Sequence, residues 1–370
     1  MSNTVNAAVF NGSGEKGKLV SVEKVPFPEI NDNQILIKSV AFAANPTDWK
    51  HSALGMAQKG AIAGSDASGV VEKVGKNVKG YESGDIVSTF MRGNYTPKRG
   101  AFSEYIIADP VTTIKYDKAG FNTTDQPSVG TQPTGLIRSF EGAASVTLGL
   151  ATVGLSFSHY LKLNPAKETN KGSAILIWGG ATATGFLAIQ VAKLIYGLKV
   201  VTTASSKHHA LLKQIGADAT FDYKDKDVVE QIRKYAGSSL KYALDTVSVP
   251  ETYQQTYDAT SGAEEVYLDN LLFLGPENIK TDSSRKVHYG KTLAYVVVGE
   301  DIYYGGVLVK TSPELVKDYS HFWYELLPQI VPKLVHTKLT FLGNGLQNAN
   351  HALELLQDEK VTGEKLVFRG

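Results

Sequence analysis

The sequence predicts a two-domain α/β protein, in which a domain of short β-strands precedes a domain of alternating strands and helices. The chain has 370 residues, more than the roughly 250 to 300 at which a single hydrophobic core stops growing. Up to about Pro110, short Val- and Ile-rich runs alternate with turn residues. From about Gly142, apolar runs alternate with helical patterns, which is typical of a parallel sheet covered by helices on both faces.

The first part of the chain contains short candidate strands separated by Gly, Pro and Asn. They cover residues 4–10, 19–24, 34–44, 68–74, 86–90 and 102–107. Short, turn-bounded strands of this kind indicate a compact antiparallel domain resembling a barrel. Residues 117–133 are rich in Thr, Asp, Gln, Pro and Gly and lack periodicity, so we expect a surface loop there.

The second part repeats a strand followed by a helix. The predicted pairs are 174–178 with 185–196, 199–203 with 208–215, and 242–245 with 250–259. A helical region at 312–334, a strand at 339–342, a helix at 348–357 and a strand at 365–368 follow. The final strand needs a sheet to join, and a return to the first domain provides one. We therefore expect one discontinuous domain of residues 1–154 and 306–370, and a second domain of residues 155–305.

Composition excludes several classes of function. Lys and Arg number 38 and Asp and Glu 37, so charge gives no reason to expect nucleic acid or an anionic membrane as partner. We expect a small-molecule substrate. The absence of cysteine excludes disulfides, thiolate metal sites and a Cys nucleophile. The N-terminus does not resemble a signal peptide, and the apolar run 143–157 is shorter than the roughly 20 residues that span a bilayer, so we expect a cytoplasmic protein.

A glycine-rich turn lies directly between a predicted buried strand and a predicted helix. Its residues are Gly179, Gly180, Ala181, Thr182, Ala183, Thr184 and Gly185. Glycines at such a turn permit close backbone approach, and the helix N-terminus presents N–H groups to a dinucleotide pyrophosphate. Thr182 replaces the usual middle glycine, so the turn must differ in detail. A turn that is glycine-rich only for tight packing is the alternative.

The end of the second predicted strand indicates which dinucleotide binds. An NAD site places Asp or Glu there, whereas this chain has Ser205, Ser206 and Lys207, which favour a 2′-phosphate. We therefore expect NADPH, with NADH as the alternative, and a helix-capping role for Ser206 as the competing explanation. Tyr223, after the third strand, is expected either beside the adenosine or in the core.

Several motifs in a fixed order resemble those of a known superfamily. They are Asn45-Pro46-Thr47-Asp48-Trp49-Lys50, Gly64-Ser65-Asp66-Ala67-Ser68-Gly69, Gly84-Asp85, Gly100-Ala101-Phe102-Ser103-Glu104-Tyr105, Glu141-Gly142-Ala143-Ala144, the glycine turn and Gly363-Glu364-Lys365-Leu366-Val367. The chain resembles zinc-independent medium-chain dehydrogenase/reductases, in particular quinone reductases and fungal enoyl-reductase-like proteins. The resemblance implies a GroES-like β-barrel domain and a Rossmann domain, with nicotinamide and substrate meeting between them, in a monomer or homodimer.

The resemblance also implies roles for individual residues. Asn45, Pro46 and Trp49 would line the nicotinamide end, and Thr152 would hydrogen-bond near its carboxamide. Lys365 would close over the cofactor. Asp245 and Val247 follow a parallel strand at its carboxyl end, where cofactors bind in doubly wound sheets.

The residues at the superfamily's metal positions do not favour zinc. Zinc-dependent relatives use Cys, a Gly-His-Glu segment and a further Cys or Asp, whereas this chain has Asn45-Pro46-Thr47-Asp48 and Ser65-Asp66 at the first two of these places. A site built from Asp48 and Asp66 alone would be weak for zinc. We therefore expect no metal.

Without a metal to polarise a carbonyl, a conjugated acceptor is the easiest hydride acceptor. We expect hydride transfer from NADPH to the β-carbon of an enone, enal, quinone or enoyl thioester, with Lys50 stabilising the oxyanion. Thr47 is a nearby hydroxyl that competes with water as proton source. Tyr95 and Tyr105 could donate a proton, but we expect both to pack. His51 is expected to be an ordinary packing or surface residue. Direct aldehyde reduction and an NADPH-binding sensor or partner-binding protein without catalysis are the alternatives.

Overall fold

The computed structural model describes residues 3–370 and shows two compact units. Unit 1 contains the chain up to Leu148 together with Glu300–Lys310 and Val335–Gly370, and unit 2 contains Gly149–Gly299 and Thr311–Leu334. The segment 311–334 thus groups with unit 2, whereas the sequence boundaries place it in the discontinuous first domain. Close packing explains this grouping, because a Cβ at Gly154 would lie only 2.3 Å from the ring of Phe322.

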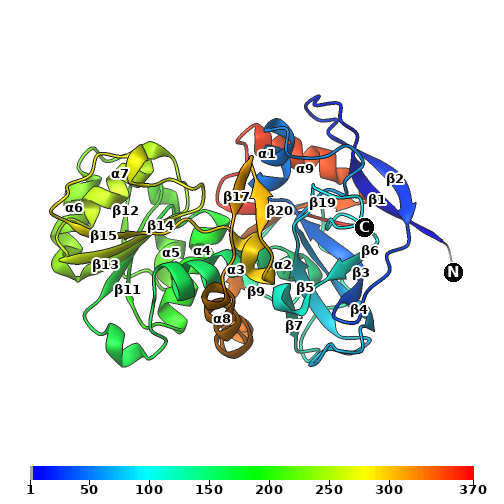
Figure 1. The fold of residues 1–370 in the computed structure, drawn as a ribbon, viewed down its shortest axis with the longest axis horizontal. Helices are drawn as coiled ribbons and strands as arrows, with labels where there is room; N and C mark the ends of the chain where they lie inside the picture. The colour runs from blue at the N-terminus through cyan, green and yellow to red at the C-terminus, as the bar shows by residue number, and fades with distance from the viewer. Residues whose placement is uncertain (1–2) are drawn as a thin grey trace. The chain divides into compact units, whose positions relative to one another are not determined.

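Unit 2 is built on a six-stranded, entirely parallel sheet (Figure 1). Its strands, in spatial order, are β12 (Ala219–Phe221), β11 (Lys199–Thr203), β10 (Ala174–Trp178), β13 (Leu240–Asp245), β14 (Glu265–Asn270) and β15 (Lys286–Tyr289). Counted along the chain within this unit, the order is the Rossmann order 3-2-1-4-5-6. The direction of strand addition reverses between β10 and β13, which is where such sheets bind their ligands.

Helices cover both faces of this sheet, and strand β10 is therefore buried on both sides. Its residues Leu176 and Trp178 pack in one core cluster with residues of α6 (Val228–Ala236) and α7 (Pro250–Ala259). Ile175 and Ile177 are fully buried and point to the opposite face, as alternation along a strand requires. Helix α4 (Ala183–Leu194) packs against β10 and β11, and α5 (His209–Gln214) packs against β12.

The largest sheet of unit 1 includes the last strand of the chain. Its spatial order is β7 (Thr113–Tyr116), β5 (Ile86–Phe90), β4 (Asp66–Val74), β3 (Ile35–Ala43), β20 (Glu364–Arg369), β19 (Lys338–Asn344) and β8 (Gly130–Gln132), and β6 (Tyr105–Ala108) also pairs with β3. Strand β20 is antiparallel to β3 and parallel to β19. The predicted return of the C-terminal strand to the first β-domain is therefore confirmed.

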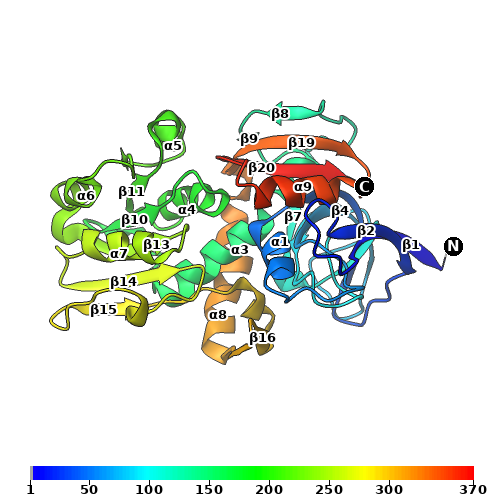
Figure 2. The same cartoon turned by 90° about the horizontal axis from the view of Figure 1, so that it is seen from above.

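The remaining elements of unit 1 complete its core and its edges. They include β1 (Thr4–Phe10), β2 (Val20–Pro26), β9 (Gly135–Leu136), β16 (Ile302–Tyr304), β17 (Val307–Val309), β18 (Val335–His336), α1 (Pro46–Ala53), α2 (Phe140–Ala144) and α9 (Asn348–Gln357). Phe42, Phe102 and Phe368 form a buried aromatic cluster with ring centroids 5.0 to 5.8 Å apart. Helix α9 packs on β19 and β20, as Figure 2 shows.

The helical stretch Phe140–Tyr160 comprises α2, α3 (Thr147–Leu155) and a π-helical turn at Ser156–Tyr160. By length and composition it is sufficient to cross a membrane, which corrects the expectation that this apolar run is too short. However, 83% of its most apolar window is buried within the protein, as is usual for a core helix.

Candidate cofactor and active site

The glycine turn connects β10 to α4 and requires glycine because the backbone is crowded. Gly179 has a φ of +84°, which side chains rarely adopt. A Cβ at Gly180 would lie 2.1 Å from the hydroxyl of Thr202, and one at Gly185 would lie 2.3 Å from the carbonyl oxygen of Gly179. The strand and the helix therefore approach each other as closely as a dinucleotide-binding turn requires.

Thr182 fits the turn because its hydroxyl caps helix α4. Its Oγ1 accepts a hydrogen bond of 2.9 Å from the N–H of Gly185 and lies 2.9 Å from Oγ1 of Thr246, at the end of β13. The first N–H groups of a helix have no intrahelical acceptor, so those of Ala183 and Thr184 remain available to an anion. The half-exposed turn residues Ala181 to Thr184 thus suit a pyrophosphate.

The two predicted cofactor residues after β13 have different environments. Asp245 is buried, and its carboxylate accepts hydrogen bonds from the N–H groups of Val247 and Ser248, each 2.9 Å, and from Thr252 Oγ1, 2.7 Å away. Burial raises the pKa of Asp245. Val247 is 41% exposed, and its Cγ2 lies 2.8 Å from where a Cβ of Gly179 would be. Asp245 therefore shapes the turn, and Val247 presents a surface beside the glycines.

The predicted 2′-phosphate residues follow β11. Ser205 Oγ donates a hydrogen bond of 3.2 Å to the hydroxyl oxygen of Tyr223, so these two predicted residues are adjacent. Ser206 and Lys207 are exposed. The N-cap residues of the 3-10 turn Ser206–His208 and of helix α5 are Ser205 and His208, so Ser206 does not occupy the alternative capping position.

Asp222, which the sequence-based site omits, lies at the same place. Its carboxylate accepts hydrogen bonds of 3.0 Å from the N–H groups of Ser206 and Lys224. The bond from Lys224, followed by that from Ser206, lowers the pKa of Asp222. The charge beside Ser206 is therefore mixed, because Asp222 brings a carboxylate to its N–H while Lys207 and Lys224, next in sequence to Ser206 and Tyr223, bear ammonium groups.

In unit 1, the predicted residues of the Asn45–Lys50 motif begin helix α1. Asn45 is the N-cap, and its N–H donates a hydrogen bond of 2.8 Å to Asp48, an arrangement known as a capping box. The other carboxylate oxygen of Asp48 accepts hydrogen bonds from Ser65 Oγ at 2.7 Å and Asn94 Nδ2 at 3.3 Å. Complete burial raises the pKa of Asp48 to about 6. The start of α1 is therefore held by buried polar groups.

A buried ion pair joins this helix start to the C-terminal strand. The ammonium group of Lys365 donates to Oδ1 of Asn45 and lies 3.7 Å from Oδ2 of Asp66. Asn45 Nδ2 donates to the same Asp66 oxygen at 2.9 Å, and the N–H of Leu148 donates to the other at 2.8 Å. Burial lowers the pKa of Lys365 and raises that of Asp66. Lys365 thus has partners within unit 1, and its predicted contact with the cofactor stays a prediction.

His51 is fully buried and part of a directed hydrogen-bond chain, which the sequence analysis did not foresee. The N–H of Gly64 donates to Asn94 Oδ1, so the amide nitrogen of Asn94 is the donor to His51 Nδ1, 3.0 Å away. In the neutral ring the proton is therefore on Nε2, which lies 2.8 Å from Thr47 Oγ1 and 3.4 Å from the hydroxyl of Tyr304. His51 orients the hydroxyl of Thr47.

The surroundings of His51 keep it neutral. Burial, and secondarily the charge of Arg92, lowers its pKa to about 4. Its ring meets the rings of Tyr95 and Tyr304 edge to face, with centroids 5.0 and 5.6 Å away. Tyr95 therefore packs, as expected. The hydrogen bonds of His51 could not be predicted from the residues next to it in sequence, because its partners Asn94 and Tyr304 are distant in sequence.

The other predicted residues belong to helices α1 and α3. Pro46 is exposed at the first position of α1, and Trp49 packs in part against the core of unit 1. Lys50 is half-buried, and its ammonium group has no hydrogen bond or ion pair with any residue between 3 and 370. Thr152 is half-buried on α3.

Family models match both units of the chain. The alcohol dehydrogenase GroES-like domain matches residues 31–118, and the zinc-binding dehydrogenase family matches residues 183–281. A trans-enoyl reductase of Gibberella zeae is 31% identical over 363 residues, covering 96% of this chain and 94% of the relative. The chain belongs to the medium-chain dehydrogenase/reductase superfamily. The expected GroES-like and Rossmann domains are confirmed, and the protein is an oxidoreductase whose fold binds a nicotinamide cofactor.

Two further relatives of this medium-chain dehydrogenase/reductase agree. An uncharacterised protein of Saccharomyces cerevisiae is 36% identical over 363 residues, covering 95% of this chain and 97% of the relative. The structure of a quinone oxidoreductase from Coxiella burnetii superposes with a TM-score of 0.65 at 22% identity, covering 99% of each chain. The latter similarity concerns the fold alone.

The second family model is named for zinc, but the residues of this reductase do not fit that metal. Where the resemblance places the first two metal-ligand segments, this chain has Asn45-Pro46-Thr47-Asp48 and Ser65-Asp66, with neither His nor Cys among them. Their oxygens are already bound: Asn45 Oδ1 accepts from Lys365, Ser65 Oγ donates to Asp48, and Asp66 accepts from Asn45 and Leu148. A zinc ion would need to displace the ammonium group of Lys365.

One other group of potential ligands occurs among the residues described. His159, Glu314 and Asp318 have ligand atoms within 4.8 Å of one another. The ammonium group of Lys162 lies 2.8 Å from Glu314 and 3.3 Å from Asp318 and already pairs with both carboxylates. The cluster is therefore an ion-pair network on unit 2.

Proposed function

We propose that the protein is a zinc-independent, NADPH-dependent reductase that transfers hydride to a conjugated acceptor. The acceptor is an enone, enal, quinone or enoyl thioester. The observation that supports this most directly is the buried contact of Lys365 with Asn45 and Asp66, which belong to the segments that the resemblance matches to the metal ligands of zinc-dependent relatives. The names of the trans-enoyl reductase and quinone oxidoreductase relatives support the class of acceptor.

The environment after β11 supports NADPH as the cofactor. Ser205 and Tyr223 offer adjacent hydroxyls, and the exposed Lys207 offers a positive charge, which together suit a 2′-phosphate. Asp222 opposes this, because its carboxylate accepts from the N–H of Ser206 and repels an anion. We propose that Lys207 and Lys224 outweigh that single carboxylate. NADH is the alternative cofactor, and its rate of oxidation is to be compared with that of NADPH.

The chain's own residues account for the rest of the reaction. When bound, the reduced nicotinamide supplies the hydride that adds to the β-carbon of the acceptor. Lys50, half-buried and without another partner among residues 3–370, stabilises the negative charge that develops on the acceptor oxygen. Thr47, whose oxygen accepts a hydrogen bond from His51, then donates its hydroxyl proton to the α-carbon of the enolate, or to oxygen when the acceptor is a quinone. A proton from solvent water restores the hydroxyl and completes the reduction.

The first experiment measures NADPH and NADH oxidation with a panel of acceptors. The panel pairs each unsaturated compound with its saturated counterpart, for example an enal with the corresponding alkanal, and adds an enone, a quinone and an enoyl thioester. We expect oxidation of NADPH with the conjugated members and a product reduced at the carbon–carbon double bond, or a hydroquinone from the quinone. Equal rates with enal and alkanal, giving alcohols, would favour the alternative of aldehyde reduction.

The same assay tests the role of Lys50. At saturating NADPH we expect Lys50→Ala to lower kcat about 10²- to 10³-fold, the usual effect of removing an oxyanion-stabilising group. Lys59→Ala, which removes an exposed lysine after the same helix, is the matched control and should have normal turnover. Normal kcat in Lys50→Ala would remove Lys50 from the reaction.

The remaining alternative is a protein that binds NADPH as a sensor or binds a partner without catalysis. Tight NADPH binding without oxidation of the cofactor by any member of the panel would favour it.

A further inference from the structure

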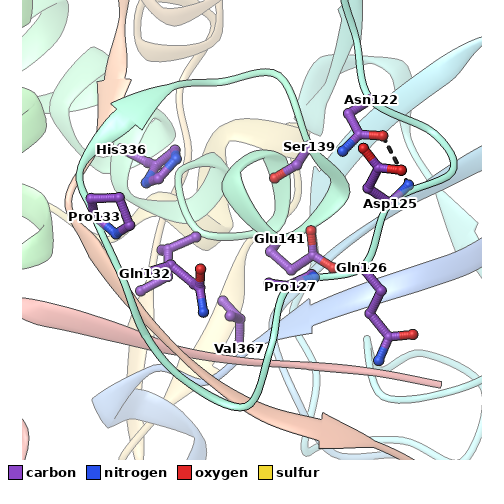
Figure 3. Close-up of a pocket in the computed structure, with 11 residues that line it drawn as sticks. Asn122, Asp125, Gln126, Pro127, Gln132, Pro133, Ser139, Glu141, His336 and Val367 are labelled. Carbon is purple, nitrogen blue, oxygen red and sulfur yellow. Dashed lines mark hydrogen bonds between the residues drawn. The ribbon is translucent and has the colours of Figure 1, made fainter.

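Unit 1 contains a pocket that is separate from the residues proposed for the reaction. Its volume is about 220 Å³, and it lies between the loop before β8, the start of α2 and strands β18, β19 and β20 (Figure 3). Apolar side chains form part of its wall, namely Pro127, Pro133, Leu339 and Val367. It is smaller than the roughly 300 to 1,000 Å³ of most drug-sized pockets, so it suits a small molecule.

His336 lines this pocket with an unpartnered ring nitrogen. Its side chain is almost completely buried, with 7% of the residue exposed, and Nδ1 donates a hydrogen bond of 2.7 Å to the carbonyl oxygen of Thr337. Burial lowers the pKa of His336, so the ring is neutral and Nε2 has a lone pair. Within residues 3–370, nothing donates a hydrogen bond to Nε2.

The position of this ring depends on Gly142 in the first turn of α2. A Cβ at Gly142 would lie 2.8 Å from Cδ2 of His336 and 3.3 Å from Nε2. Only glycine therefore lets the imidazole lie against the helix. The unpartnered nitrogen is fixed in place by close packing.

Two more acceptors face the same space. Glu141 is 2% exposed, and Oε1 accepts a hydrogen bond of 2.5 Å from Arg369, whereas Oε2 has no donor in the part of the chain that the structure describes. Gln132 donates from Nε2 to the carbonyl oxygen of Ser128 at 2.7 Å, which leaves its amide oxygen as the unpaired atom. The pocket thus offers acceptors on a histidine, a carboxylate and an amide.

The charge around the pocket is negative. Glu141 and Asp125 line it with carboxylates, and the guanidinium group of Arg369, which pairs with Glu141, supplies a positive charge nearby. With His336 neutral, one negative charge is left over. A ligand that matches these groups has several N–H donors and a positive charge.

We propose that this pocket binds a small primary alkylammonium ion. Its –NH₃⁺ group has three donors for the three acceptors, and its alkyl chain contacts the proline, leucine and valine side chains. A volume of 220 Å³ is about seven times the roughly 30 Å³ that a water molecule takes up in the liquid, which leaves room for a short chain. The inference is independent of the proposed reductase activity.

The test is a titration of the folded protein with n-butylammonium chloride, observed through the side-chain nitrogen resonances of ¹⁵N-labelled histidine. We expect a saturable shift of the Nε2 resonance of His336, with a dissociation constant of about 1 mM or lower. Three solutes are the controls. Sodium chloride at equal ionic strength and tetramethylammonium carry the positive charge but no N–H donors, and n-butanol has neither. A shift that does not saturate, or that is equal for all four solutes, overturns the proposal.

Matched glutamine variants distinguish binding in the pocket from binding elsewhere. Gln132→Leu should weaken n-butylammonium binding about tenfold, because it removes a hydrogen bond to a charged group. Gln126→Leu changes a residue of the same pocket whose amide is already paired with that of Asn344 in both directions, at 2.9 and 3.3 Å, and should bind normally. Thermal melting checks that both variants fold. Equal affinity in wild type and Gln132→Leu would also overturn the proposal.

Discussion

The ammonium group of Lys365 donates a hydrogen bond to the side-chain oxygen of Asn45, a residue 320 positions earlier in the chain. Both residues are almost completely buried, and both also contact the carboxylate of Asp66. The three residues come from the N-cap of α1, the start of β4 and strand β20. The helix that bears Thr47 and Lys50 therefore begins at a point that the C-terminal strand holds in place.

Lys365→Met should strongly destabilise the protein. It leaves the buried carboxylate of Asp66 without its cation, and breaking a buried pair by removing one partner costs about 3 to 5 kcal/mol. The free energy of unfolding from urea titration measures the effect. Lys360→Met is the control, because the side chain of Lys360 is 64% exposed and its pair with Asp358 should be worth less than about 1 kcal/mol. Similar losses in the two variants would contradict a special role for the buried pair.

Metal removal should not affect catalysis. The oxygens of Asn45, Ser65 and Asp66 are bound to Lys365, Asp48 and the backbone N–H of Leu148, so we expect a chelator to extract no ion from this place. We expect equal rates before and after dialysis against EDTA, and no gain when zinc is added. Elemental analysis of the purified protein provides the metal content per chain. A loss of rate that zinc restores would show that the ion displaces Lys365 after all.

The hydroxyl of Thr182 should stabilise helix α4 as its N-cap. Thr182→Ala removes the acceptor for the N–H of Gly185 and should lower the free energy of unfolding by about 1 kcal/mol. Thr182→Ser keeps the hydroxyl and should stay near wild type. Chemical denaturation measures both variants, and NADPH affinity measured in parallel shows whether the cap also shapes the phosphate site. Identical stability of the Ala and Ser variants would refute the cap.

If the protein prefers NADPH, as proposed, Lys207 should determine that preference. We expect Lys207→Ala to raise KM for NADPH about tenfold, the effect of losing a charge-assisted hydrogen bond to a phosphate, and to leave KM for NADH unchanged. Lys213→Ala removes an exposed lysine from α5 and is the matched control. Steady-state kinetics with each cofactor measures the two KM values. An equal rise in KM for NADPH and for NADH would place Lys207 outside the 2′-phosphate site.

His51 should make stability depend on pH. Its pKa falls from 6.5 in the unfolded chain to about 4 in the folded protein, so between these values the unfolded chain binds the extra proton. Its contribution therefore increases as pH rises through this window and is complete above pH 6.5, at about 3 kcal/mol. Asp48 has the opposite effect on stability. Because folding raises its pKa to about 6, the folded protein binds its proton more tightly, and its contribution to stability falls as pH rises.

The comparison of wild type with His51→Gln separates these two groups. Both proteins contain Asp48, so the difference between their unfolding free energies reports His51. Measured from pH 4 to pH 7, this difference should grow in favour of wild type. A difference that is constant with pH would mean that His51 titrates normally in the folded state.

Segments with strong periodicity could be predicted closely from sequence. Strands β1, β5, β10 and β11 and helices α7 and α9 have the predicted bounds. The predicted loop 117–133 contains the edge strand β8, whose polar residues Gly130–Gln132 gave no alternating pattern. Helix α6 was not among the predicted elements, although Val228, Ile232 and Ala236 recur at four-residue spacing on its buried face.

The candidate site could be predicted only where its residues are contiguous. The glycine turn and the Asn45–Lys50 motif are local, so both appear in the sequence. The directed contacts of Asn94 and Tyr304 with His51 join residues 43 and 253 positions apart, and no local spacing reveals them. Asp222 was missed because it follows strand β12, 16 positions after Ser206, and its carboxylate meets the N–H of Ser206 only in the folded protein.

The placement of β20 between β3 and β19 has a consequence for synthesis on the ribosome. All six strands of the Rossmann sheet lie within residues 174–289, so that sheet can close while translation continues. The sheet of the GroES-like domain is complete only after residues 364–369 are made. Until they emerge, residues 41–43 of β3, beyond the part that β6 already covers, present an open edge to other nascent chains. Premature termination near the end of the message would therefore leave a finished cofactor domain attached to an aggregation-prone one.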